Sequence, residues 1–292
     1  MNKYSKDRSQ KTGLVLGLGA APGLAHIGVI KVLEQNDVRV DIVSGSSVGA
    51  FIGACYAKNR DVSEVEELFL NTDWKRMAEL IDPKLSVLSK GLLSGQKVKE
   101  FLESVIGDVE FKDLKIPLAI VATDLDSGEE VIFKEGSVLD AVRASISMPA
   151  VFVPVKIGNR YLIDGGSSNP LPVDVVKEMG AEYVIVSNIV PSPSQRETSL
   201  KKRKNGGDRE SFLNNVKEKL FGAEDESLPN MFDVLVQSLH VTEYKIVERK
   251  LREADLVITP EIAQIGTLDF TRGKEAIRKG EEAAREVFKG NE

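Results

Sequence analysis

The sequence predicts an α/β fold with a mainly parallel sheet and helices on both faces. Short apolar runs alternate with segments of helical periodicity from residue 13 onward, which is the pattern of strand-helix-strand units. The first two apolar runs are each followed by a glycine-containing turn and then a helix. The 292 residues are 42% hydrophobic, so the chain can bury a large core.

The first two units show this alternation most clearly. Residues 14–16 form an apolar run typical of a buried strand, and residues 24–35 follow a helical period. Residues 38–43 predict a second strand. Residues 48–57 are apolar almost all round, as expected for a helix buried against a sheet.

The same two periodicities predict the remaining elements. Helices are expected at residues 61–80, 96–106, 231–254 and 273–288. Strands are expected at residues 116–123, 131–133, 151–157, 161–163, 183–187 and 256–260.

The chain is expected to form one catalytic domain, residues 13–290, after a flexible polar N-terminus, residues 1–12. The apolar connector 83–95 is expected to cover a site. Residues 191–208 are rich in Pro, Ser, Lys, Arg and Gly and predict a mobile loop. The basic run 201–204 within it could contact anionic lipid head groups, although a solvated charge run is the commoner case.

Composition and charge exclude several classes of protein. The net charge of -6 opposes nucleic-acid binding, which needs a basic surface. The single cysteine, Cys55, lies in an apolar helical pattern and cannot build a disulfide framework or a Cys-rich metal site. The sequence has neither an apolar leader nor a run of about 18 apolar residues. We therefore expect a cytoplasmic protein whose contact with a membrane would be peripheral.

The sharpest local signal is Gly45-Ser46-Ser47-Val48-Gly49, between a predicted strand and a predicted buried helix. This context makes G-x-S-x-G a nucleophile elbow. The turn must expose the Ser47 hydroxyl above the edge of the sheet, and the two glycines remove side chains that would clash where strand and helix pack. Ser47 is therefore the candidate nucleophile.

A nucleophilic hydroxyl needs a base, and the chain contains only two histidines, His26 and His240. His26 falls in the helix after the first loop. His240 falls in a long helical pattern rather than in the loop where a triad would place it. A structural role is the commoner one for both, and a triad through His240 stays open as an alternative.

The strongest candidate base is Asp164, which ends an apolar strand and precedes Gly165 and Gly166. An acid at the carboxyl end of a strand lies at the edge where doubly wound folds place their sites. The rival interpretation is an Asp-Gly turn of a hairpin. The presence of the elbow and the shortage of histidines favour the catalytic interpretation.

A third element is the small-residue loop Gly-Leu-Gly-Ala-Ala-Pro-Gly at residues 17–23, bounded by Gly17 and Gly23. Such a loop can direct backbone N–H groups toward an oxyanion. A dinucleotide-binding fingerprint is the alternative, but Pro22 replaces its third glycine.

With these three elements in this order, the sequence resembles the patatin-like phospholipase family, in particular its compact bacterial and archaeal members. Residues 45–49 match the family's nucleophile motif, and residues 164–166 match its Asp-Gly-Gly motif. Residues 23–28 and 143–150 are similar to two further typical stretches. The likeness covers about residues 13–191 and, more weakly, 256–280.

The resemblance implies a serine-aspartate dyad acting on acyl esters of lipids. Ser47 would attack the ester carbonyl, Asp164 would take its proton, and the amides of Gly19 and Ala20 would hold the oxyanion. The resemblance also implies that no metal or cofactor is needed.

The loop departs from the family's usual Gly-Gly-Gly-x-Arg-Gly, because residues 18–23 read Leu-Gly-Ala-Ala-Pro-Gly. Pro22 stands where the arginine is usual, yet it deletes neither of the two expected amide donors. Ala20 would carry about 1 kcal/mol or more of strain if the loop requires a positive φ there. The alternative to an active hydrolase is thus a catalytically weakened lipid-binding or regulatory protein that keeps the Ser/Asp pair.

Overall fold

In the part of the chain that the structure describes, an eight-stranded sheet forms the centre, in the order β5-β6-β3-β2-β1-β7-β8 with β4 also paired to β3. The computed structural model describes residues 10–71, 95–192, 194–195, 231–267 and 269–289. The parallel strands are β1 (Thr12–Leu16), β2 (Ile42–Ser46), β3 (Leu118–Asp124), β7 (Tyr183–Ser187) and β8 (Leu256–Ile258). The strands that join antiparallel beyond β3 are β4 (Glu130–Phe133), β5 (Val155–Ile157) and β6 (Arg160–Asp164).

Helices connect most of these strands, whereas short turns join β3 to β4 and β5 to β6. The α-helices are α1 (Ala25–Gln35), α2 (Val48–Asn59), α3 (Ser63–Asn71), α6 (Gln96–Ile106), α7 (Val138–Ser145), α8 (Val173–Glu178), α11 (Met231–Lys250) and α12 (Gly273–Lys289). The short 3-10 helices are η2 (Ala21–Leu24), η3 (Phe111–Asp113), η4 (Gly165–Ser167), η5 (Leu251–Glu253) and η6 (Phe270–Arg272).

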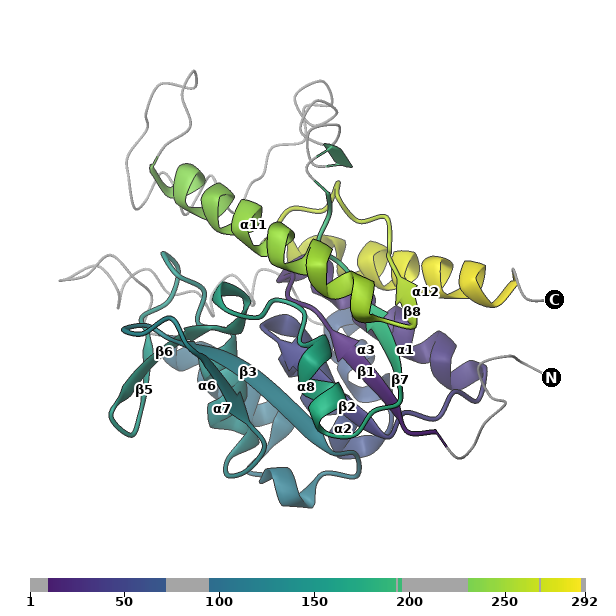
Figure 1. Ribbon diagram of the computed structural model, residues 1–292, viewed down its shortest axis with the longest axis horizontal. Coiled ribbons are helices and arrows are strands. Elements are labelled where there is room, and N and C mark those ends of the chain that lie inside the picture. The colour runs from purple at the N-terminus through teal and green to yellow at the C-terminus, as the bar shows by residue number, and fades with distance from the viewer. Residues whose placement is uncertain (1–9, 72–94, 193, 196–230, 268, 290–292) are drawn as a thin grey trace.

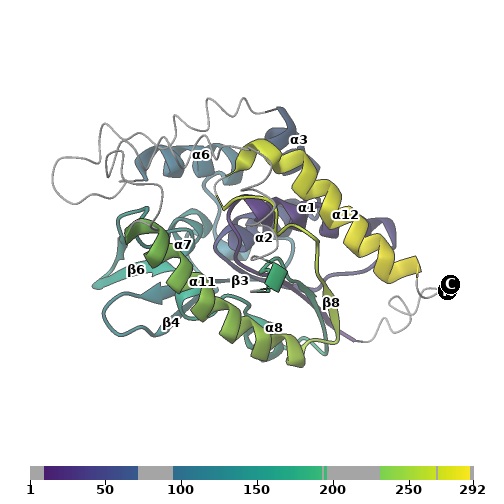
Figure 2. The ribbon, with the colours of Figure 1, turned by 90° about the horizontal axis from the view of Figure 1, so that it is seen from above.

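Successive side chains of β1 point to opposite faces of the sheet, as strand geometry requires. Leu14 and Leu16 join the larger core with α1, α2 and α12, whereas Val15 packs in a second cluster with residues of α8 and α11. Figures 1 and 2 show these two groups of helices on opposite sides of the sheet. The predicted fold class is therefore confirmed.

Helices α1 and α12 cross at close range because each places a glycine at the crossing. A Cβ on Gly28 would lie 2.0 Å from the carbonyl oxygen of Ile277, and a Cβ on Gly280 would lie 2.0 Å from the carbonyl oxygen of Ala25. Any side chain at either position would force the helices apart. This packing fixes α1, which begins beside the small-residue loop.

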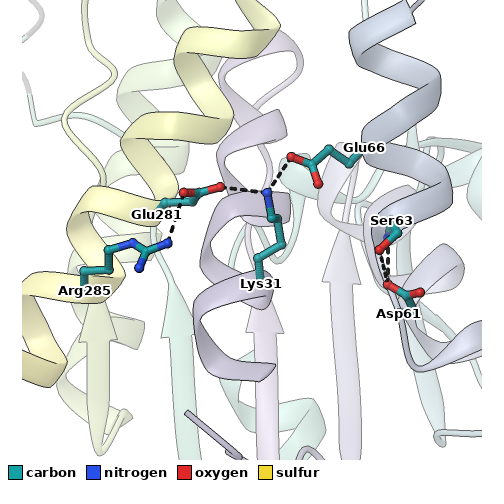
Figure 3. A network of polar contacts seen from close by, with 6 residues as sticks. All are labelled: Lys31, Asp61, Ser63, Glu66, Glu281 and Arg285. Carbon is teal, nitrogen blue, oxygen red and sulfur yellow. Dashed lines mark hydrogen bonds and ion pairs between the residues drawn. The ribbon is translucent and has the colours of Figure 1, made fainter. Parts of the chain in front are cut away.

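Lys31 of α1 joins three helices through charge. Its ammonium donates to Glu66 of α3 at 2.6 Å and to Glu281 of α12 at 2.8 Å, as Figure 3 shows. Arg285 of α12 also donates to Glu281, at 3.4 Å. These contacts link segments 35 and 250 residues apart in the chain.

The strand predicted at residues 38–43 is wrong in position, because β2 is Ile42–Ser46. Val38 and Val40 are buried in the connection after α1. Their apolar character therefore reflects burial rather than pairing in the sheet.

Three other predicted elements begin two or more residues later than expected, among them the strand predicted at residues 116–123, which begins at Leu118. The strand predicted at residues 151–157 begins at Val155, directly after Pro154, which has no N–H to donate to a neighbouring strand. The helix predicted from residue 61 begins at Ser63, whose N–H donates to the Asp61 carboxylate at 2.8 Å.

Helices α7 and α8 were not predicted. By contrast, α6 and β7 have the predicted bounds. The connector 83–95 apart from Gly95, the predicted helix beyond Asn71, and most of residues 1–12 and 191–208 lie outside the described residues. Within the ranges given above, no helix is both long enough and apolar enough to cross a membrane.

Candidate active site

Ser47 lies at the sharp turn between β2 and α2. Its backbone has φ 56° and ψ −128°, a conformation that non-glycine residues rarely adopt and that costs about 1 to 3 kcal/mol. A Cβ on Gly45 would lie 2.5 Å from the carbonyl oxygen of Gly49, and one on Gly49 would lie 2.2 Å from that of Leu16. The two glycines are thus needed for the turn, as the elbow motif predicts.

The Ser47 hydroxyl is bonded to Asp164. Its Oγ donates to Asp164 Oδ2 at 2.7 Å, and Asp164 Oδ1 accepts the Gly166 N–H at 2.8 Å. Both members of the pair are only 6% exposed. Each carboxylate oxygen therefore has a neutral donor in a site largely shielded from water.

Strand register explains how residues 117 positions apart come together. Ser46, just before the nucleophile, pairs with Val121 of β3, and Asp164 pairs with the next residue, Ala122. A Cβ on Gly165 would lie 2.2 Å from the carbonyl oxygen of Val121. A glycine after the aspartate is thus what permits this close approach.

Burial changes the acidity of Asp164. Desolvation raises its pKa from 3.8 to about 6, although the hydrogen bonds from Ser47 and Gly166 act in the opposite direction. The ionised carboxylate is therefore a stronger base than an aspartate in water, with a pKa near the range that suits proton transfer at neutral pH.

The end of helix α7 holds the backbones of both residues. Ser145 Oγ accepts the Ser47 N–H at 2.9 Å, and the carbonyl oxygen of Ser147 accepts the Asp164 N–H at 3.0 Å. Ser147 Oγ accepts from the Arg143 guanidinium at 2.6 Å and donates to the Arg143 carbonyl at 2.9 Å. Sequence reasoning found this stretch only as part of a family likeness. The signal it overlooked was the pair of serines at the end of an apolar helix.

Most amides of the small-residue loop are already used. Leu18 N–H donates to Pro170 at 3.1 Å, Ala21 N–H to Thr267 at 2.9 Å and Gly23 N–H to Ala20 at 2.9 Å. Pro22 has no N–H. Counting only partners among the described residues, the loop amides that remain available are those of Gly19 and Ala20, the two expected oxyanion donors.

The loop lies against the residue that follows the nucleophile. A Cβ on Gly23 would lie 1.9 Å from Val48 Cγ1, and a Cβ on Gly19 would lie 2.2 Å from Ile189 Cδ1. Ala20 has φ 43° and ψ −128°, so the positive φ considered from the sequence is present. Ala20 therefore carries strain that a glycine would avoid.

His26 is buried and supports this loop. Nε2 lies 2.8 Å from the carbonyl oxygen of Gly17, and Nδ1 lies 2.7 Å from Ser187 Oγ. A carbonyl can only accept, so Nε2 carries the proton and Nδ1 accepts from the Ser187 hydroxyl. Burial lowers the pKa of His26 to about 4, although the bond to Gly17 acts in the opposite direction. The imidazole is therefore neutral and has the structural role expected for it.

The other candidates from the sequence lie in helices. His240 lies in α11, as predicted, and Cys55 is buried in α2. Desolvation raises the pKa of the Cys55 thiol to about 12, which keeps it protonated and unreactive. Across the described ranges, no three His, Cys, Asp or Glu side chains gather in a way that could hold a metal ion.

One protein-family model covers the small-residue loop, the nucleophile elbow and the aspartate together. The model for Patatin-like phospholipase matches residues 14–177, a span that contains the loop, the elbow and Asp164. An NTE family protein of Mycobacterium tuberculosis is 34% identical over 181 residues, which cover 62% of this chain and 49% of that protein. Lysophospholipase NTE1 of Debaryomyces hansenii is 27% identical over 284 residues, which cover 93% of this chain and 17% of that protein.

The chain therefore spans about half the length, or less, of these two relatives. Among solved structures, the crystal structure of VipD from Legionella pneumophila aligns with a TM-score of 0.52 and 14% identity, covering 97% of this chain and 67% of that one. At this identity the likeness concerns the fold alone.

Proposed function

Because the chain belongs to the patatin-like phospholipase family, we propose that it is a serine acyl hydrolase that cleaves acyl esters of lipids. Ser47 is the nucleophile and Asp164 the general base. The observation that carries this proposal is the 2.7 Å hydrogen bond from Ser47 Oγ to Asp164 Oδ2 in a buried site. The names of the relatives, phospholipase and lysophospholipase, support lipid esters as the substrate class.

In the first half of the reaction, Ser47 Oγ attacks the ester carbonyl carbon and its proton passes to Asp164 Oδ2. The carbonyl oxygen becomes an oxyanion, which the amides of Gly19 and Ala20 stabilise. The tetrahedral intermediate then expels the alcohol, which takes the proton from Asp164. An acyl group remains esterified to Ser47.

In the second half, a water molecule replaces the alcohol. Asp164 takes a proton from this water as it attacks the acyl-serine carbonyl, and the same two amides hold the second oxyanion. Collapse of this intermediate returns the proton from Asp164 to Ser47 and releases the fatty acid. One carboxylate thus serves as base and acid in turn, for which a pKa of about 6 is well suited.

Lipid substrates are held in aggregates and bilayers, so the proposal includes peripheral contact with a lipid surface. It requires neither a metal ion nor a cofactor, because the nucleophile, the base and the oxyanion donors are all supplied by the chain.

The first test is covalent labelling with a fluorophosphonate, followed by mass spectrometry to locate the adduct. We predict a single adduct on Ser47, and that Ser47→Ala abolishes both labelling and hydrolysis, lowering activity by about 10⁴-fold or more. Ser46→Ala is the matched control, because Ser46 Oγ is buried, has no hydrogen-bond partner among the described residues and contributes no nucleophile. Undiminished labelling of the Ser47→Ala protein would refute the assignment.

The backbone of Ala20 favours a second candidate function, a catalytically weakened lipid-binding or regulatory protein. Its φ of 43° carries strain at the position of an oxyanion donor, and Pro22 supplies no charge nearby. Steady hydrolysis of a p-nitrophenyl acyl ester separates the two functions. A weakened protein would label at Ser47 but show no sustained turnover.

A further inference from the structure

One stripe of helix α11 faces a cavity of about 330 Å³. The helix contributes residues spaced at i, i+3, i+4, i+7 and i+8, which lie on one helical face: Leu235, Ser238, Leu239, Thr242 and Glu243. The opposite wall comes from the segments on either side of β5 and β6: Pro149, Ala150, Gly166 and Ser167.

The cavity adjoins the candidate catalytic pair. Gly166 lines the cavity, and its N–H donates to Asp164 Oδ1 at 2.8 Å. The other oxygen of the same carboxylate accepts from Ser47 at 2.7 Å. A single carboxylate therefore separates the cavity wall from the nucleophile.

The surface of the cavity is mostly apolar. Leu235 on its wall is 49% exposed, so the cavity opens to the outside. Its volume falls within the range of about 300 to 1,000 Å³ typical of small-molecule sites. An open apolar site of this size is suited to a slender apolar group rather than to a hydrated one.

Charge argues against a lipid head group as the occupant. Residues 234–242 of α11 contain no Asp, Glu, Lys or Arg. Among the residues that line the cavity, the one of ionisable type is the acidic Glu243, so the lining supplies no cation to a phosphate. An uncharged chain needs no such cation.

We propose that this cavity binds an acyl chain of the lipid substrate, with Leu235 and Leu239 as its apolar wall. The proposal rests on the function proposed above and adds to it the site that determines which acyl-chain lengths the protein prefers. Each methylene buried there should favour binding by about fourfold. The protein should therefore prefer medium and long acyl chains over short ones.

The test compares kcat/KM on p-nitrophenyl butyrate and p-nitrophenyl laurate. Leu239→Trp, which fills the cavity, should lower the laurate-to-butyrate ratio by about tenfold or more. The matched control is Val241→Trp on the same helix, because Val241 is 51% exposed and is not part of the cavity wall. It should leave the ratio within about twofold.

Leu235→Ser provides a second variant that should fold normally, because Leu235 is half exposed, and it should also lower the ratio. Binding of a fluorescent fatty acid to the Ser47→Ala protein provides a readout that does not need turnover, and adding Leu239→Trp should weaken it. If Leu239→Trp weakens fatty-acid binding but the wild-type protein hydrolyses no ester, the proposed function is refuted and the acyl-chain site is retained. Unchanged ratios in both variants, or unchanged fatty-acid binding, would overturn the site.

Discussion

The Ser47 cluster (Ser47, Asp164 and Gly166) and the Lys31 cluster (Lys31, Glu66 and Glu281) have hydrogen bonds of similar length but different chemistry. Each joins segments far apart in sequence through hydrogen bonds to carboxylates of 2.6 to 2.8 Å. Asp164 has only neutral donors, and burial raises its pKa to about 6. Burial alone would also raise the pKa of Glu281, but the hydrogen bond and charge of Lys31 hold it below its ordinary value.

The depth of burial and the charge of the partner together decide what a carboxylate can do, because Asp164 is 6% exposed and the Glu281 side chain is 24% exposed. A cation within hydrogen-bond distance stabilises the ionised form and makes it a poor base, whereas neutral donors leave the cost of burial uncompensated. The Lys31 cluster is suited to holding α1, α3 and α12 together. The Ser47 cluster is suited to moving a proton.

Among the substitutions that test this comparison, Asp164→Asn has the largest expected effect. Asparagine can still accept the Gly166 N–H through Oδ1, so the site should keep its shape while losing its base. We expect kcat/KM to fall by at least about a hundredfold. The measurement is hydrolysis of p-nitrophenyl esters by the folded variant, with His240→Ala as the control for the triad alternative. Loss of activity in His240→Ala and not in Asp164→Asn would reverse the assignment.

The same variant should be more stable than the wild type at pH 8. Asp164 has a folded-state pKa above its unfolded value, so its favourable contribution is present below about pH 4 and is lost as pH rises through 6. Above that pH the ionised carboxylate costs about 3 kcal/mol, which asparagine avoids. Urea unfolding of both proteins at pH 8 and pH 4 should show the difference shrinking at the lower pH. If the two proteins differ in unfolding free energy by the same amount at pH 8 and pH 4, burial does not destabilise the ionised form of Asp164.

The pH dependence of the wild type should show the next largest effect. If ionised Asp164 is the base, kcat/KM on an uncharged ester should rise about tenfold per pH unit and level off above a pKa near 6. Lys31→Met should give the same profile, because its cluster is apart from the proton transfer. A profile whose acid limb disappears in His240→Ala would instead indicate a histidine base.

A smaller effect is expected from Ser145→Ala, which removes the acceptor of the Ser47 N–H. Leaving a buried N–H unpaired costs about 1 to 3 kcal/mol, and the positive φ of Ser47 would lose one of its supports. We predict a fall in kcat of about tenfold, with KM and the pH profile unchanged. Ser145→Thr, which keeps a hydroxyl, should recover part of the rate. A loss of stability without any change in kcat would mean that Ser145 serves the fold alone.

The sequence predicted Ser47 and Asp164 because each lies in a short local motif, with its glycines beside it. It did not predict Ser145 and Ser147, because their roles depend on hydrogen bonds across the fold, such as the one that spans 98 residues to Ser47. The misplaced strand at residues 38–43 has a related cause, since burial in a connection gives the same apolar run as burial in a strand. Long-range pairing is what local patterns leave out.

The smallest effect is expected from Lys31→Met, the substitution that tests the other half of the comparison. Methionine keeps the apolar stem of the lysine but removes the charge that joins Glu66 and Glu281 (Figure 3). These side chains are 18 to 26% exposed, so the loss should be about 1 kcal/mol of unfolding free energy and should shrink at high salt. Lys31→Arg, which keeps the charge, is the control.

Esterase activity of Lys31→Met should stay within about twofold of the wild type, because among the described residues the hydrogen bonds of this cluster do not reach the Ser47 pair or the small-residue loop. One route between the two clusters is α1, which carries Lys31 near its middle and His26 near its start. A second is α12, which carries Glu281 and packs against η2 in the small-residue loop. His26 holds the Gly17 carbonyl and thereby the loop that presents the Gly19 and Ala20 amides. A marked fall in kcat for Lys31→Met at full folding would therefore mean that a shift of α1 or α12 reaches the loop. In that case the two clusters are mechanically coupled, and the division between a structural and a reactive carboxylate cluster no longer holds.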